Sequence, residues 1–265
     1  MIVPGTSHIK HVGRLLLTVL AIISATAVSL QAMADPLILQ GSTTFNRLVF
    51  ERHEEAIEAK SGQELTIIPN RSMLGIIALM EGRAHMAMIS APLESEVNRL
   101  KKEMPKLDYD RLRSFEVLST RVAFVVNPAN PVRKMSLDQV KKILTGNMTN
   151  WSALGGKDAP IRMVFVGSGG GVITTVESEL LNSESVRGPN IIRVRTALQL
   201  VQVVEQEPNA FGIAQLSLTR QKGLPEIVTD KPIEQSLSFI TLGAPTPAMQ
   251  AVIDAARNVL ANAMR

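Results

Sequence analysis

The chain has 265 residues, a formal net charge of +4 and no cysteine. The absence of cysteine excludes disulfides, thiolate metal sites and a lipid attached to an N-terminal cysteine. The modest charge, with one tryptophan and one tyrosine, argues against nucleic-acid binding, which needs basic stripes and stacking aromatic side chains.

The first element in the chain, residues 1–34, has the layout of a secretory signal peptide. Basic residues including Lys10 and Arg14 precede an apolar run that ends near Ser29, and small residues place cleavage after Ala34. A single-pass membrane anchor is the alternative, although the run is short for a bilayer. We therefore expect an exported protein of a bacterial periplasm, whose net charge falls to +2 when Lys10 and Arg14 are removed.

Strand and helix signals alternate in the first half of the remaining chain. Helical periodicity predicts amphipathic helices, and short apolar runs predict strands between them. This order predicts a mostly parallel, doubly wound sheet, whose ligands bind at the carboxyl ends of the strands. The predicted strands are 37–40, 64–69, 85–90 and 121–128, and the predicted helices are 45–60, 75–81 and 94–103.

A second α/β unit follows a linker at 127–131, where two prolines favour an extended path. Ser136 is a predicted N-cap for the first helix of this unit. Pro247 suits the first turn of the last helix of the chain. The predicted helices are 137–144, 173–182, 197–206 and 246–264, and the predicted strands are 161–166, 191–194, 211–213, 225–230 and 237–242.

Three polar turns follow predicted strands: GSTTF at 41–45, NRS at 70–72 and GSGGG at 167–171. Each precedes a predicted helix, so hydroxyls and free backbone N–H groups would meet at the positive ends of helix dipoles. This arrangement binds an anion without a metal. For any one turn, the alternative is a plain strand-to-helix turn with a capping hydroxyl.

The spacing of the glycine loop at 167–171 excludes three catalytic or nucleotide-binding motifs. A dinucleotide fingerprint needs glycine where Val172 stands, a P-loop needs a Lys-Ser or Lys-Thr pair, and a nucleophile elbow needs glycine where Val166 stands. A serine hydrolase built on Ser168 would need a base that the sequence does not offer. No His or carboxylate cluster has metal-ligand spacing. We predict a binding protein rather than an enzyme, with no cofactor and no metal.

Six segments together carry a family resemblance over nearly the whole exported part, and ILTGNMTNWSALGG at 143–156 is the most specific stretch. The chain resembles the phosphate-binding proteins of bacterial phosphate ABC importers, within the type II periplasmic binding proteins. The resemblance implies two α/β lobes joined by two crossovers, residues 35–126 with 214–265 and residues 127–213. The six segments are 41–45, 75–96, 122–132, 137–161, 167–171 and 209–218.

The resemblance also implies where an oxyanion is held. The Thr-Phe pair of the family matches Thr44 and Phe45, its next serine matches Ser72, and its Ser-Gly pair in the second lobe matches Ser168 and Gly169. With the neighbouring hydroxyls, the substituted positions and one candidate cation, the predicted binding residues are Thr43, Thr44, Phe45, Arg71, Ser72, Ser90, Ser168, Gly169 and Gly170.

Three departures from the family pattern bear on the ligand. Ser90 stands where the family has aspartate or arginine, Val164 where it has arginine, and Gly170 where it has threonine. Loss of one charge-assisted hydrogen bond weakens anion binding by about one to two decades. Arg71 is the candidate replacement cation, and a solvated turn arginine is the alternative for that side chain.

These observations predict an exported monomer that closes over a small oxyanion, phosphate first, and then docks on a membrane ABC permease. The alternative is a periplasmic sensory or interaction protein of the same fold that has lost or changed its ligand. Its partner would be a membrane sensor. The missing arginine and aspartate motivate this alternative.

Overall fold

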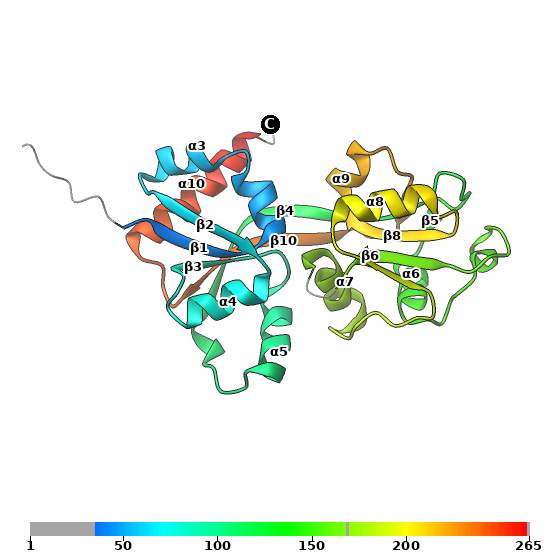
Figure 1. Ribbon diagram of the computed structural model, residues 1–265, viewed down its shortest axis with the longest axis horizontal. Helices are drawn as coiled ribbons and strands as arrows, with labels where there is room; N and C mark the ends of the chain where they lie inside the picture. The colour runs from blue at the N-terminus through cyan, green and yellow to red at the C-terminus, as the bar shows by residue number, and fades with distance from the viewer. Residues whose placement is uncertain (1–34, 168–169, 264–265) are drawn as a thin grey trace, which may run out of the picture. The chain divides into compact units, whose positions relative to one another are not determined.

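The computed structural model describes residues 35–167 and 170–263 of the chain (Figure 1). The predicted signal peptide at 1–34 and the predicted binding residues Ser168 and Gly169 lie outside these described residues. The family expectation of an α/β fold is confirmed, because helices flank both ends of a long mixed sheet.

The strands follow the spatial order β2-β1-β3-β10-β4-β8-β6-β7, and β9 pairs with both β4 and β5. The strand pairs β1–β2, β1–β3, β6–β7 and β6–β8 are parallel, whereas β10 and β4 pair antiparallel with their neighbours. The strands are β1 (Leu37–Ser42), β2 (Leu65–Asn70), β3 (Met86–Ile89), β4 (Leu112–Val126), β5 (Lys134–Met135), β6 (Arg162–Val166), β7 (Ile191–Val194), β8 (Ala210–Gln215), β9 (Glu226–Thr229) and β10 (Ile233–Leu242).

Strand β4 is longer than the sequence predicts, because it begins at Leu112 rather than at residue 121. Its first nine residues are mostly exposed or half-buried, and the strand pairs with β10 over the register Leu112–Leu242 to Val122–Ile233. An antiparallel strand with one face in water carries polar residues, so it lacks the apolar run that reveals a buried strand. The sheet is therefore continuous between the two halves of the fold.

The helices cover the two ends of the sheet, with α3, α4, α5 and α10 at one end and α6, α7, α8 and α9 at the other (Figure 1). Short 3-10 turns lie at Tyr109–Arg111 and Trp151–Leu154. The longer helices are α3 (Glu54–Ser61), α4 (Ser72–Met80), α5 (Leu93–Glu103), α6 (Leu137–Leu144), α7 (Gly171–Leu181), α8 (Ala197–Gln206), α9 (Leu216–Gln221) and α10 (Pro247–Ala263).

The single helix predicted at 45–60 is wrong, because this segment is broken in three. Helix α2 (Thr43–Phe45) runs into a π-helical turn, η1 (Asn46–Phe50), and α3 starts only at Glu54. The wider π turn brings residues five apart onto one face. Phe45 and Phe50 therefore both contact Phe239, with ring centroids 4.7 and 6.0 Å away.

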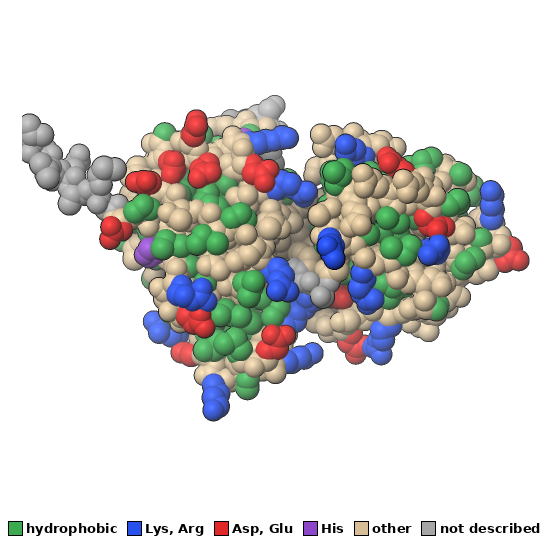
Figure 2. All heavy atoms as spheres, viewed as in Figure 1, with side chains coloured by type: hydrophobic (Ala, Val, Ile, Leu, Met, Phe, Trp, Pro, Cys, Tyr) green, Lys and Arg blue, Asp and Glu red, His purple; other side chains and the backbone are tan. Residues whose placement is uncertain are grey.

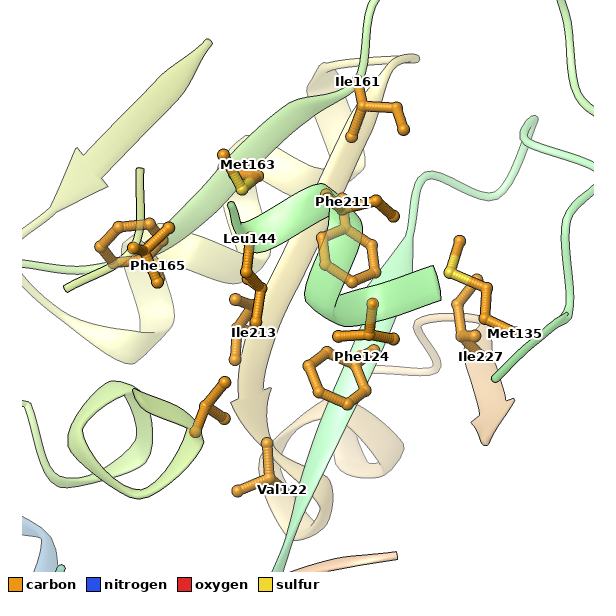
Figure 3. Packing of buried hydrophobic residues seen from close by; sticks show 14 of the residues in the cluster. Val122, Phe124, Met135, Leu144, Ile161, Met163, Phe165, Phe211, Ile213 and Ile227 are labelled. Carbon is orange, nitrogen blue, oxygen red and sulfur yellow. The ribbon is translucent and has the colours of Figure 1, made fainter. Parts of the chain in front are cut away.

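Buried side chains form separate cores at the two ends of the sheet, which we call the first and second lobes. In the first lobe, Leu39, Phe45 and Phe239 pack beneath α10. In the second lobe, Phe124 and Phe211 stack with centroids 5.6 Å apart and an interplanar angle of 5° (Figure 3). Strands β4 and β10 run from one lobe to the other (Figure 1).

The residue boundaries that the sequence assigns to the lobes stay a prediction. The packing of the cores bears on one of these boundaries, the one predicted between residues 213 and 214. Leu216 and Leu224 pack with Val164 and Leu200, and Ile227 packs with Phe124. Residues directly after β8 thus contribute to the core of the second lobe.

Candidate functional site

A cleft of about 870 Å³ opens between the two lobes. It is lined by the last residues of four strands, Ser42 of β1, Asn70 of β2, Val166 of β6 and Val194 just at the end of β7. Parallel α/β sheets bind ligands at this carboxyl edge, because the turns that follow the strands point their free N–H groups and side chains there. The cleft is therefore the candidate binding site.

The first-lobe wall carries hydroxyl groups at the end of β1. Ser42, Thr43 and Thr44 line the cleft, and the Oγ of Ser42 accepts a hydrogen bond from the backbone N–H of Phe45 at 3.2 Å. Ser42 therefore caps the start of α2 and fixes the orientation of the threonines that follow. Thr43 is exposed and Thr44 is half-buried, so their hydroxyls are accessible from the cleft.

Beneath these threonines, three buried serines form one hydrogen-bonded cluster. The Oγ atoms of Ser42 and Ser90 lie 2.7 Å apart, and the backbone N–H of Ser90 points to the Oγ of Ser72 at 3.4 Å. All three side chains are at most 4% exposed. A buried, satisfied cluster of this kind holds its hydroxyls in fixed positions.

Two glycines allow backbone segments to pack closely enough to bring this serine cluster together. A Cβ on Gly75 would lie 2.3 Å from the carbonyl oxygen of Gln40, so only glycine lets the start of α4 pack on β1 and brings Ser72 to the cleft. A Cβ on Gly171 would lie 2.0 Å from the Oγ of Ser90. The first turn of α7 thus packs directly on Ser90, and this contact joins the two lobes at the floor of the cleft.

Among the described residues that line the cleft, the charged ones are three arginines and one glutamate. Arg47, Arg71 and Arg195 line it together with Glu51, and Figure 2 shows Lys and Arg side chains on both sides of the hollow between the lobes. The cleft is therefore net positive, which favours an anion. Val164, where the resemblance leads one to expect an arginine, is fully buried in the core of the second lobe and brings no charge to the cleft.

Arg47 is tied to the floor of the cleft by a chain of buried amides. Its guanidinium donates to the Oε1 of Gln215, whose Nε2 donates to the Oε1 of Gln235 at 3.1 Å. Gln235 in turn donates to the backbone carbonyl of Ser90 at 2.7 Å. These bonds connect strands β8, β10 and the end of β3 under the site.

The structure places the predicted binding residues in two positions. Those that line the cleft are Thr43, Thr44, Arg71, Ser72 and Gly170. Phe45 and Ser90 lie behind the wall, where the Phe45 ring is fully buried in the first-lobe core and Ser90 is 1% exposed. Their backbone and hydroxyl groups support Ser42 rather than line the cleft, and a ligand contact by any of these residues stays a prediction.

The cleft lining also includes four residues that were not predicted as site residues, namely Ser42, Arg47, Arg195 and Thr196. Arg195 and Thr196 form a fourth polar turn after a strand, and Thr196 caps α8 by accepting from the N–H of Gln199 at 3.1 Å. The same rule that selected the other turns would have selected this one. Arg47 lies three residues after Thr44, which places both on one side of a helical turn.

No three His, Asp or Glu side chains among residues 35–167 and 170–263 gather as a metal site. No helix in these same ranges is long and apolar enough to cross a membrane.

Comparison with known proteins places this geometry in a family. The family model described as a PBP superfamily domain matches residues 26–257. The phosphate-binding protein PstS of Bacillus subtilis is 28% identical over 177 residues, which are 66% of this chain and 55% of that protein. The chain thus spans about half the length of this curated relative.

Solved structures show the same fold over more of their length. An ABC-type phosphate transport receptor from Vibrio cholerae has a TM-score of 0.70 at 22% identity, covering 86% of this chain and 96% of that one. A Clostridium perfringens protein described as a phosphate ABC transporter substrate-binding protein, with bound phosphate, has a TM-score of 0.66 at 23% identity, covering 86% and 97%. At these identities the likeness shows the fold.

Proposed function

The chain belongs to the PBP superfamily, and from this premise we propose that it is an exported solute-binding protein that holds a small oxyanion, phosphate first, in its interlobe cleft for an ABC importer. The relatives named above are phosphate-binding and phosphate-transport proteins. The proposal includes export by the signal peptide at 1–34, a periplasmic location, a monomeric state and docking on a membrane permease.

One observation carries this proposal, namely that hydroxyls and cations converge on the same cleft without a metal cluster in the described residues. Thr43, Thr44 and Ser72 supply hydroxyl donors from the first lobe, and Arg71 and Arg195 supply charge from opposite walls. Charge-assisted hydrogen bonds of this kind are the strong ones for oxyanions. The N-terminus of α7 adds the positive end of a helix dipole at Gly170.

Contacts between the lobes support a closing motion as part of this function. The Oγ of Ser95 on α5 donates to the Oγ of Ser178 on α7 at 2.7 Å, and Arg99 on α5 forms an ion pair with Glu177 on α7. Strands β4 and β10 connect the same lobes as continuous extended segments. Hinge bending of such segments, with the α5–α7 contact formed in the closed state, is the motion we propose.

The first test is a thermal shift with phosphate, sulfate, arsenate, molybdate and tungstate at millimolar levels. Binding to the folded state raises the melting temperature by mass action, so at least phosphate is expected to raise it. If none of the five anions shifts the melting temperature, oxyanion binding is excluded and the sensory alternative, with a membrane sensor as partner, takes its place.

Arginine variants then test the site itself. Among the described residues, Arg71 and Arg195 make no side-chain hydrogen bond or ion pair, so their removal breaks no such bond within these residues. Arg71→Ala and Arg195→Ala are each expected to weaken phosphate binding about tenfold or more, by calorimetry at low salt. Arg193→Ala is the matched control, because this exposed arginine lies two residues from Arg195 and outside the cleft lining. Equal affinities of Arg195→Ala and Arg193→Ala would remove Arg195 from the site.

A further inference from the structure

Glu96 is a buried carboxyl group that the proposed binding site does not yet use. It lies on α5, is 1% exposed, and its Oε1 has no hydrogen-bond partner among the described residues. A buried carboxylate without full hydrogen bonding is costly, so a role beyond packing is expected for it. Glu94, two residues earlier on the same helix, is exposed to solvent.

The polar neighbour of Glu96 is Ser72, one of the hydroxyl residues of the cleft. Helix α5 packs against α4, and the Ser72 hydroxyl lies at the start of α4, where its hydrogen bonding lowers the pKa of the Glu96 carboxyl. The Ser72 side chain thus lies between the buried carboxyl on one side and the cleft on the other. The Ser72 hydroxyl has one proton, so it can donate either to the Glu96 carboxyl or to a ligand in the cleft, but not to both at once.

The charged groups around Glu96 are few. On its own helix, Arg99 lowers the pKa of Glu96, but it also pairs with Glu177, the acidic residue that α7 brings to this contact. Helix α4 carries no charged residue between Ser72 and Met80, and the exposed Arg71 precedes it. Burial is the largest influence on Glu96 and raises its pKa, because it disfavours the charged form of the carboxyl.

We propose that Glu96 is a positioning residue of the oxyanion site, whose carboxyl sets the direction of the Ser72 hydroxyl, so that the bound complex holds one proton shared between Glu96, Ser72 and the anion. This inference rests on the proposed function. It gives the cleft a proton-linked carboxyl although Ser90 replaces the aspartate of the family pattern.

The two protonation states have opposite effects on the ligand. When Glu96 is ionised, the Ser72 O–H donates to the carboxylate, and the Oγ lone pair that does not accept from the Ser90 N–H faces the cleft, which suits only an anion that still carries a proton. When Glu96 is protonated, its O–H donates to the Ser72 Oγ, and the Ser72 O–H donates to the anion. An anion therefore either brings its own proton or binds as Glu96 takes one from solvent, and no bond other than O–H changes.

The experiment compares proton uptake on phosphate binding between wild type and Glu96→Gln, by calorimetry in buffers of different ionisation enthalpy across about pH 5 to 8. A glutamine amide donates to the Ser72 Oγ at every pH and takes up no proton. We expect wild type to take up as much as one proton more than Glu96→Gln where free Glu96 is ionised. Its affinity relative to the variant should then fall by up to about tenfold per pH unit.

Three comparisons make the result decisive. Glu94→Gln, the same change at an exposed position of α5, is expected to keep the wild-type proton count. In a Ser72→Ala background, Glu96→Gln is expected to change the proton count no further, because the link to the anion is gone. Melting curves establish that each variant is folded. Phosphate that binds with equal proton uptake in wild type and Glu96→Gln overturns the inference, whereas phosphate that binds to neither overturns the proposed function instead.

Discussion

The two walls of the cleft are built in different ways. The first-lobe wall consists of hydroxyl side chains that a buried cluster of Ser42, Ser72 and Ser90 holds in place. The second-lobe wall consists mainly of backbone at the start of α7 and of the turn at Arg195 and Thr196. The first wall carries its geometry within one lobe, whereas the second obtains its position from contacts that reach across to the first.

This difference determines which substitutions disturb each wall of the cleft. Removing a hydroxyl from the first wall takes one hydrogen bond from the site, and the rest of the lobe is unchanged. Disturbing a contact that seats α7 moves the whole second wall, because Gly171 packs on Ser90 and Glu177 pairs with Arg99. Substitutions at the seat of α7 should therefore affect both stability and binding, although the side chains concerned touch no ligand.

The largest effect is expected for Gly171→Ala. The new Cβ would lie 2.0 Å from the Ser90 Oγ and 2.5 Å from the Ser90 carbonyl oxygen, and the backbone of one lobe must shift to relieve the overlap. Overpacking of this kind costs about 3 kcal/mol. We expect a lower urea midpoint together with loss of phosphate binding.

Gly170→Ala is the steric control for this variant. Among the described residues, its Cβ would meet its nearest neighbour at 3.5 Å, an ordinary contact, so its free energy of unfolding is expected to stay within about 0.5 kcal/mol of wild type. A similar loss of stability in both variants would contradict the seating of α7 on Ser90.

The next effect concerns the ion pair that joins the lobes. The side chain of Glu177 is 8% exposed and that of Arg99 is 23% exposed. Glu177→Gln leaves the guanidinium without its charge partner, which costs about 2 kcal/mol, because Arg99 keeps some contact with water. If the pair stabilises the closed state, phosphate should also dissociate faster, as stopped-flow kinetics can measure.

An exposed ion pair just beyond α7 provides the matched control. Arg187 and Glu184 are 68% and 62% exposed, so Glu184→Gln is expected to change stability by less than about 0.5 kcal/mol. Dissociation rates that agree in Glu177→Gln, Glu184→Gln and wild type would mean that the α5–α7 contact has no part in closure.

Much of the fold could be predicted from the sequence because its signals are local. The short parallel strands are buried apolar runs, and Ser136 forms the capping box with Gln139 that begins α6. The first part of β4 and the break in the helix after Phe45 depend instead on pairing with β10 and packing on Phe239. Residues far apart in the chain decide both features, so periodicity does not reveal them.

The candidate site divides in the same way. Polar turns after strands identified Thr43, Thr44 and Ser72, because the carboxyl ends of parallel strands meet at one edge. The burial of Ser90 under Gly171 could not be predicted, since it depends on how the second lobe packs on the first. The nearness of Glu96 to Ser72 likewise follows from the packing of α5 on α4, and the charged face of α5 gave no sign of it.

The smallest expected effect tests the first-lobe wall alone, through the pH dependence of stability. Burial raises the pKa of Glu96 above its ordinary value of 4.5, and Arg99 and Ser72 offset only part of this. In the pH window above 4.5 and up to the raised value, the unfolded chain has lost this proton while the folded chain retains it. Folding therefore becomes less favourable as pH rises through that window.

Glu96→Gln removes this dependence because an amide does not titrate. Urea unfolding of wild type and variant, from about pH 4 to about pH 8, is expected to show that the stability of wild type relative to the variant falls as pH rises and then levels off. Glu94→Gln should show no such trend. A difference that is constant with pH, or that grows in favour of wild type at high pH, would mean that Glu96 ionises in the folded protein without cost, and the first-lobe wall would then hold its hydroxyls without a proton-linked support.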